Sequence, residues 1–246
     1  MLRIREGRDA MANFVLVHGA WHGGWCYKRV AGLLRRAGHE VYTPTLTGLG
    51  ERAHLIRPTV SLETHVDDVV GVLRCEELSD VVLCGHSYGG MVISGVAEQA
   101  ADRLRALVYL DAFVPENGQS LFDLLPSGRA GSMRADAREN GEGYMVTPPP
   151  AAYFNVNAAD AAWVDAMCVK HPVACFEQRL VLAGGRDRVA RRVYILASGW
   201  ESASFPPFAK RFERDPAWQV RRIDCGHDVM LDRPDELAAA LAAAAA

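Results

Sequence analysis

Residues 85–89 read Gly-His-Ser-Tyr-Gly, a Gly-x-Ser-x-Gly pattern that could make its serine a nucleophile. An apolar run precedes the pattern and a sequence with helical spacing follows it. A serine hydroxyl becomes nucleophilic when a base takes its proton and a tight turn lifts it clear of the backbone. Gly85 and Gly89 lack Cβ, which permits such a strand-to-helix turn. We therefore predict Ser87 as the nucleophile; the alternative is an ordinary serine in a glycine-rich connection.

A base and an acid must accompany such a serine. His227 follows the last apolar run of the chain, between Gly226 and Asp228, and is predicted to be the base. Asp111 ends an apolar run, where an ionised carboxylate needs a partner such as an imidazole N–H, so it is the favoured acid. Glu201, after the penultimate run, is the main alternative acid, with Asp224 or another acid as a lesser one. Asp111 and Glu201 both keep the chain order serine, acid, histidine.

The segment His18-Gly-Ala-Trp directly follows the first apolar run and suits the stabilisation of an oxyanion. Gly19 is small enough for the backbone to approach a substrate closely. The backbone N–H groups of Ala20 and Tyr88 are predicted to form an oxyanion hole, a contribution of several kcal/mol. His18 is predicted to order this loop.

A metal site built from His18, His22 and His86 is an alternative use of these histidines. The chain has no carboxylate or thiol near them at a recognised ligand spacing. No metal and no cofactor are therefore predicted.

Strand-like and helix-like segments alternate along most of the chain. Apolar runs typical of strands buried on both faces of a parallel sheet lie at residues 14–17, 81–84, 106–110 and 193–197, with a weaker run at 218–223. Helical patterns lie at residues 27–37, 61–75 (with Ser61 as N-cap), 88–100, 208–213 and 234–246. The alternation predicts an α/β fold with a doubly wound, mostly parallel sheet.

Residues 113–190 break the alternation, because they are rich in proline and glycine and contain only short helix-like pieces. We expect an inserted helical lid here, over the carboxyl end of a core formed by residues 13–112 and 191–246. Residues 1–12 are expected to be a disordered extension. The predicted pocket residues are Gly19, Trp21, Phe113, Trp163 and Trp200.

The composition favours one domain acting on a small molecule. The 246 residues are 50% hydrophobic and 23% charged with a net charge of −3, which does not indicate a nucleic-acid surface. The first ten residues lack the apolar core of a signal peptide, and no run reaches the ~18 apolar residues of a membrane span. The six cysteines form no Cys-x-x-Cys pair. We expect reduced thiols, a cytoplasmic location and no membrane partner.

Three motifs together carry a family resemblance: the segment at residues 15–25, the Gly-His-Ser-Tyr-Gly-Gly segment at 85–90, and Gly-His-Asp at 226–228. They resemble the α/β-hydrolase superfamily, in the branch of plant methyl esterases, the salicylate-binding esterase, hydroxynitrile lyases, bacterial EstC-like esterases and pyrethroid hydrolases. The resemblance implies an α/β-hydrolase fold with the roles predicted above for the serine, the histidine and the two amides. The plant members carry their acid after the penultimate strand, whereas some haloalkane dehalogenases carry theirs where Asp111 stands.

The resemblance also bears on the reaction. The related hydroxynitrile lyases have a threonine where this chain has Gly19 and a lysine where it has Asp228, so lyase activity is not expected. We expect a serine hydrolase that cleaves a small to medium, mostly apolar carboxylic ester through an acyl-enzyme intermediate. The alternatives are a C–C bond or lactone hydrolase with the same residues, or a non-catalytic receptor for a small ligand. The plant esterases also make a homodimer plausible.

Overall fold

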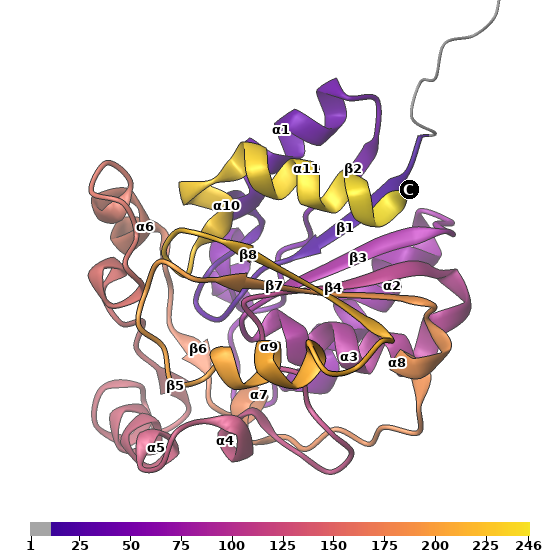
Figure 1. The fold of residues 1–246 in the computed structure, drawn as a ribbon. Coiled ribbons are helices and arrows are strands. Elements are labelled where there is room, and N and C mark those ends of the chain that lie inside the picture. Colours follow the sequence, from indigo (N-terminus) through magenta and orange to yellow (C-terminus); the bar gives the residue numbers. More distant parts are fainter. Residues whose placement is uncertain (1–10) are drawn as a thin grey trace, which may run out of the picture.

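A sheet of six parallel strands, in the order β2-β1-β3-β4-β7-β8, lies at the centre of the computed structural model (Figure 1). The structure describes residues 11–246. The strands are β1 (Asn13–Val17), β2 (Glu40–Tyr42), β3 (Val81–His86), β4 (Leu104–Leu110), β7 (Arg191–Ala197) and β8 (Trp218–Ile223). The predicted parallel α/β sheet is confirmed. Strand β2, a three-residue edge strand without an apolar run, was not predicted.

The burial of the strands explains why their sequences differ. All of β3 and every residue of β4 except Arg105 are buried, because helices cover both faces of the sheet. The edge strand β8 buries Trp218 and Ile223 at its ends and exposes polar residues between them, which makes its apolar pattern weaker. The apolar run is thus strongest in the strands that helices cover on both sides.

The helices form one layer on each face of the sheet (Figure 1). Helices α1 (Lys28–Arg36) and α11 (Pro234–Ala245) pack together on one face, and α2 (Leu62–Cys75), α3 (Gly89–Ala100) and α9 (Pro206–Phe212) lie on the other. Ser61 caps α2 in a reciprocal pair with Thr64, as its sequence predicts. A short helix α10 (Val229–Asp232) precedes α11, and single 3₁₀ turns lie at Gly24–Tyr27, Gly50–Leu55, Ala101–Arg103 and Ala151–Phe154.

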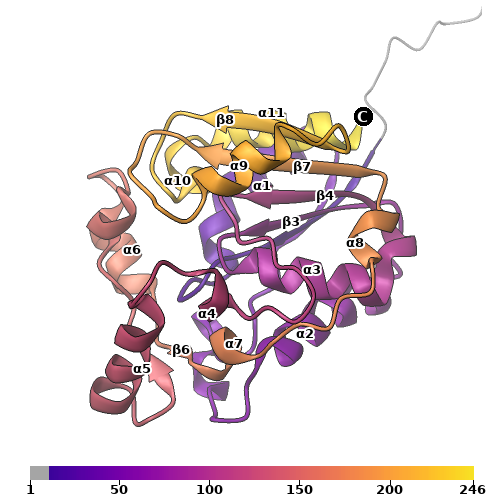
Figure 2. The same cartoon turned by 60° about the horizontal axis from the view of Figure 1, so that its bottom comes forward.

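The inserted segment forms several helices and one small two-stranded sheet beside the carboxyl ends of the strands (Figure 2). Its elements are α4 (Leu121–Leu124), α5 (Arg129–Asn140), β5 (Met145–Val146), α6 (Ala161–Met167), β6 (His171–Pro172) and α7 (Ala174–Glu177), with β5 antiparallel to β6. Residues 178–190, including α8 (Gly185–Arg188), instead return along α3, where the Gly185 N–H donates to the Glu98 carboxylate at 2.6 Å. The part that covers the sheet is thus shorter than residues 113–190.

Residues 1–10 of the expected disordered extension lie outside the described residues. For Ala12 the expectation is wrong. Its side chain is buried, its N–H donates to His39 Nδ1 at 3.3 Å, and its carbonyl accepts from the Glu40 N–H at 3.1 Å. The ordered chain therefore includes the residue before β1, because β2 supplies a backbone partner that the sequence did not reveal.

Candidate active site

Ser87 occupies a sharp turn between β3 and α3. Its φ of 53° lies in the left-handed region, which residues other than glycine rarely adopt and which costs about 1–3 kcal/mol. The turn holds this conformation by hydrogen bonds: the Ser87 N–H donates to the Leu110 carbonyl at 3.1 Å, and its carbonyl accepts from Phe113 at 3.2 Å. A Cβ on Gly85 would lie 2.5 Å from the Gly89 carbonyl oxygen. The turn therefore has no room for a side chain at Gly85, as the sequence suggested.

His227 and Asp111 are in direct contact. Nδ1 of His227 lies 2.7 Å from Oδ2 of Asp111, and both side chains are buried. The loop after β8 supplies the histidine and the end of β4 supplies the carboxylate. Glu201, the alternative acid, is exposed and makes no hydrogen bond to the ring within residues 11–246. The carboxylate beside the predicted base is therefore that of Asp111.

Asp111 sits in a strained and crowded setting. Its φ is 41°, again left-handed, and its carboxylate also accepts hydrogen bonds from the Ala197 N–H at 3.1 Å and from Trp200 Nε1 at 3.1 Å. Burial raises the pKa of Asp111, and the hydrogen bonds from His227, Ala197 and Trp200 act against that rise. Three donors on one buried carboxylate fix its orientation toward the imidazole.

The imidazole of His227 is held by its surroundings as well as by Asp111. Its ring stacks on Phe205 with the centroids 5.0 Å apart, and its backbone N–H donates to the Phe154 carbonyl at 2.9 Å. Because Nδ1 is engaged by the carboxylate, Nε2 is the nitrogen left for a reacting group.

Ser87 and His227 line one cavity of about 530 Å³. Of the predicted pocket residues, Trp21, Phe113 and Trp200 also line it. The inserted segment contributes apolar walls, namely Leu121, Leu125, Met133, Tyr153, Phe154 and Phe176. Leaving the tyrosines aside, the charged or titratable side chains that line it are those of His227, Arg129 and Glu201. The cavity therefore suits a largely uncharged molecule.

Two predicted pocket residues do not line this cavity. Trp163 packs edge-on against Trp25, with the ring centroids 4.8 Å apart, in a separate hollow between α1 and α6. The sequence of a short helix does not say which of its sides faces the site, so this prediction was wrong. Gly19 lies behind the cavity: a Cβ there would come within 2.9 Å of His86 Nδ1 and 3.1 Å of the Ser87 Cβ. Its small size serves packing against the serine turn.

The two predicted oxyanion donors both border the cavity. Within residues 11–246, the backbone N–H groups of Ala20 and Tyr88 make no hydrogen bond to the protein, so both remain available to a ligand. The Tyr88 side chain is anchored beneath, where its hydroxyl lies 2.9 Å from Nδ1 of His65. Two free donors next to a strained serine can bind an oxygen that becomes negative.

The loop that carries Ala20 is fixed by neighbouring histidines. Nδ1 of His18 donates to the Gly19 carbonyl at 2.8 Å and its Nε2 accepts from Leu46 at 3.1 Å, the ordering role that the sequence suggested. Burial lowers the pKa of His18 to about 3, so the ring is neutral as this pattern requires. On the lid side, the Trp21 N–H donates to Nδ1 of His171 at 3.2 Å.

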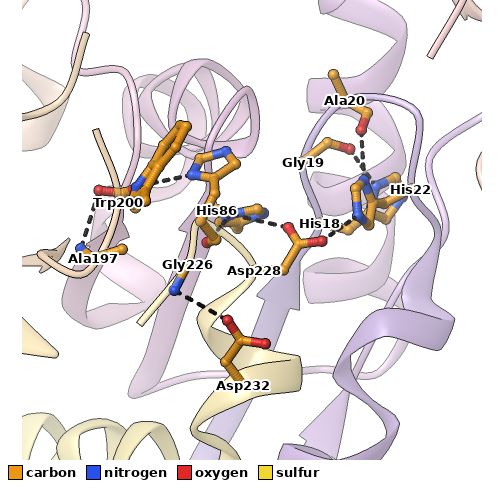
Figure 3. Close-up of polar contacts among 12 residues, drawn as sticks. His18, Gly19, Ala20, His22, His86, Ala197, Trp200, Gly226, Asp228 and Asp232 are labelled. Carbon is orange, nitrogen blue, oxygen red and sulfur yellow. Dashed lines mark hydrogen bonds and ion pairs between the residues drawn. The ribbon is translucent and has the colours of Figure 1, made fainter. Parts of the chain in front are cut away.

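Sequence reasoning missed three residues that join the site's loops. His86 Nε2 lies 3.0 Å from the His227 carbonyl, and Nε2 of His22 lies 3.1 Å from Oδ2 of Asp228 (Figure 3). His86 and Asp228 are chain neighbours of Ser87 and His227, which is the one signal the sequence offered.

In the described chain, the ligand atoms of His65, His171 and Cys175 lie close enough to share a metal ion, but both ring nitrogens of His65 already have protein partners.

The comparisons with known proteins agree with this architecture. Residues 14–240 match the alpha/beta hydrolase family, and the chain belongs to that family. It is 55% identical to the carbendazim hydrolyzing esterase of Nocardioides sp. (strain SG-4G), over 95% of this chain and 99% of that protein. It is 26% identical to Methylesterase 10 of Arabidopsis thaliana, over 94% and 90% of the two chains.

Solved structures are similar as well. An extracellular alpha/beta-hydrolase from a Paenibacillus species superposes with a TM-score of 0.83 at 25% identity, covering 95% of this chain and 98% of that one. A pyrethroid hydrolase from Sphingobium faniae JZ-2 shares the fold, with a TM-score of 0.73 at 22% identity over 96% and 98% of the chains. The expected family is confirmed, and the protein is a hydrolase of the esterase type.

Other expectations concern the protein's surroundings. No helix within residues 11–246 has both the length and the hydropathy to cross a membrane. All six cysteines are free. The cytoplasmic location and the homodimer stay predictions.

Proposed function

We propose that the protein hydrolyses a small to medium, mostly apolar carboxylic ester through Ser87, His227 and Asp111. The observation that carries this proposal is the 2.7 Å contact between His227 Nδ1 and Asp111 Oδ2, at a cavity that Ser87 also lines. Such a contact orients the ring and stabilises the imidazolium that forms when His227 takes the proton of Ser87.

The reaction would proceed in two halves. Ser87 Oγ attacks the ester carbonyl while His227 takes its proton, and the resulting oxyanion accepts hydrogen bonds from the Ala20 and Tyr88 N–H groups. His227 then protonates the leaving alcohol, and an acyl group remains on Ser87. Water attacks this acyl-enzyme with His227 as the base, which releases the carboxylic acid and restores the serine. Removal of one oxyanion donor typically costs about 3–4 kcal/mol in such reactions.

The substrate class follows from the cavity walls. They are aromatic and aliphatic over most of the lining, with few charged groups, which favours an uncharged ester with an apolar or aromatic part. The relative that is 55% identical is named for the hydrolysis of carbendazim. We therefore include carbendazim among the substrates that this chain would accept.

The test compares wild-type protein with Ser87→Ala on p-nitrophenyl acetate, p-nitrophenyl butyrate and carbendazim. Ser132→Ala is the matched control, because Ser132 lines the same cavity and only donates to the Gly128 carbonyl at 3.2 Å. We expect kcat to fall by about 10³-fold or more in Ser87→Ala and to change little in the control. Equal rates in wild type and Ser87→Ala would exclude Ser87 from the reaction.

A fluorophosphonate probe distinguishes an enzyme from a receptor with an inert pocket. An activated serine reacts rapidly with such a probe, whereas an ordinary hydroxyl does not. We expect one adduct on Ser87, located by mass spectrometry, and none in Ser87→Ala. A wild-type protein that stays unlabelled and hydrolyses none of the three esters would contradict the proposal.

A further inference from the structure

His22 makes two hydrogen bonds that a neutral histidine cannot donate together. The residue is 2% exposed; Nδ1 lies 2.8 Å from the Ala20 carbonyl oxygen and Nε2 lies 3.1 Å from Oδ2 of Asp228 (Figure 3). A carbonyl oxygen and an ionised carboxylate only accept hydrogen bonds. Both ring nitrogens must then carry hydrogen, so the geometry itself points to an imidazolium facing a carboxylate.

The electrostatics of the site agree with that protonation state. Burial is the strongest single influence on the pKa of His22 and lowers it, but the attraction and hydrogen bonds of Asp228 and Cys168 together raise that pKa well above 6.5. Burial would likewise raise the pKa of Asp228, yet the facing His22 holds it below its ordinary range. Two titratable groups touch the pair: Cys168 lies 4.0 Å from His22 Nδ1, and His86 lies 3.9 Å from Asp228 Oδ1. His18, Cys26 and His227 also interact electrostatically with one member of the pair. His86 is kept neutral, chiefly by burial.

The pair connects two loops of the site. His22 lies two residues after Ala20, and Asp228 directly follows His227. The His22 ring also stacks on Trp25, with centroids 5.2 Å apart. A contact between residues 206 positions apart in the chain thus ties the loop of the oxyanion donor to the loop of the base.

The contact with Ala20 acts on a peptide group next to the free N–H. The peptide before the Ala20 α-carbon is fixed where His18 donates to the Gly19 carbonyl. The peptide after it is fixed at both ends, because His22 donates to the Ala20 carbonyl and the Trp21 N–H donates to His171. With both peptide planes held, the Ala20 N–H keeps one direction. A charged donor makes the stronger hydrogen bond here.

We propose that His22 and Asp228 are positioning residues for ester hydrolysis: their buried ion pair fixes the loop so that the Ala20 N–H points at the developing oxyanion. This inference rests on the proposed function for the role of Ala20, while the ion pair itself stands on the geometry alone. A donor that helps only the transition state changes kcat and leaves KM nearly unchanged.

Two isosteric replacements of His22 separate its contacts. The amide nitrogen of asparagine reaches about as far as Nδ1, so His22→Asn can still donate to Ala20. The longer glutamine places its amide near Nε2, so His22→Gln keeps a donor for Asp228 and loses the one for Ala20. Each replacement removes the charge of the pair and keeps only one of its two contacts, so we expect kcat for p-nitrophenyl butyrate to fall by about tenfold or more in both variants, with similar KM values. Wild-type kcat in either variant would overturn the proposal.

Asp228→Asn tests the partner, with Asp232→Asn as its matched control. Asp232 holds the same loop by accepting from the Gly226 N–H at 3.1 Å, but it does not touch the Ala20 loop (Figure 3). We expect about a tenfold lower kcat in Asp228→Asn at unchanged KM, and a clearly smaller loss in Asp232→Asn. Wild-type kcat in Asp228→Asn would also overturn the proposal, and this arm decides the matter if His22→Gln does not fold.

The charge on His22 can be measured directly in the wild-type protein. Nitrogen-15 NMR of the histidine rings at pH 8, with His22 assigned from the His22→Asn spectrum, should show both of its nitrogens protonated. A neutral His22 ring would refute the ion pair whatever the kinetics. If the wild type hydrolyses no ester, the proposed function fails, whereas this spectrum still reports on the pair.

Discussion

Replacing Asp111 with asparagine tests whether its negative charge, and not its shape, serves His227. The carboxylate accepts from three donors: Ala197 N–H on Oδ1, and Trp200 Nε1 and His227 Nδ1 on Oδ2. An asparagine side chain offers an acceptor at one end and a donor at the other. It therefore cannot satisfy all three donors in either orientation.

Each orientation of the amide has a definite consequence. With its oxygen toward His227, the amide NH₂ meets the Ala197 N–H, and one buried donor pair is left unsatisfied at about 1–3 kcal/mol. With its NH₂ toward His227, the amide opposes Trp200 Nε1 and makes Nδ1 the acceptor, so that the ring hydrogen moves to Nε2. That tautomer cannot take a proton from Ser87. In both cases the imidazolium loses its counter-charge, and we expect kcat to fall by about 10²–10⁴-fold with a small change in KM.

The assay measures kcat and KM for p-nitrophenyl butyrate in wild type, Asp111→Asn and Glu201→Gln. Glu201 is the matched control because it borders the same cavity but is exposed. Urea unfolding of each variant shows whether a loss of rate reflects unfolded protein. A large loss in Glu201→Gln together with nearly wild-type kcat in Asp111→Asn would refute the assignment of the acid.

Two further predictions concern stability. Four buried histidines have pKa values lowered by burial, to about 3 for His18 and about 4 for His65, and well below 6.5 for His86 and His171. The unfolded chain therefore binds protons first as the pH falls through 6.5, and each histidine lowers the free energy of unfolding by about 1.4 kcal/mol at pH 5.5 relative to pH 8. His22, with its raised pKa, acts in the opposite direction and offsets at most about 2 kcal/mol of the combined loss. Urea unfolding should therefore show a net loss of about 3.5 kcal/mol, and a gain at pH 5.5 would contradict these protonation states. Separately, Gly89→Ala would place a Cβ 2.8 Å from the Val17 carbonyl oxygen. We expect the free energy of unfolding to fall by about 1–3 kcal/mol and kcat to fall strongly. A stable, fully active variant would show that the turn tolerates a side chain.

The parts of the fold that sequence could predict are those where local pattern and packing agree. The central strands read as apolar runs because both of their faces are buried, and α2 begins at Ser61 because a cap signals its own position. The three residues of β2 carry no such pattern, since an edge strand needs only one neighbour. Helix α5 was missed because it buries only Met133 and Ala137 fully and leaves its other residues half-buried or exposed.

The site was predictable to a similar limit. Ser87, Asp111 and His227 each follow a strand, and the carboxyl ends of parallel strands meet at one edge, so sequence order sufficed to nominate them. Trp163 was assigned wrongly to the pocket because the direction of a side chain on a short helix depends on tertiary packing. The contact between His22 and Asp228 joins residues from opposite ends of the chain. No periodicity or spacing in one sequence reveals such a pairing.

The arrangement of the loops explains how reacting groups can stay free while their positions are fixed. Ser87 and His227 each have a chain neighbour whose side chain binds another loop: His86 beside Ser87 donates to the His227 carbonyl, and Asp228 beside His227 binds His22. These contacts use the neighbours' side chains, so the Ser87 hydroxyl and the Ala20 N–H need not anchor the loops themselves. A site held in this way pays its ordering entropy on folding rather than on binding substrate. Loosening a neighbour should therefore slow the chemical step more than it weakens substrate binding.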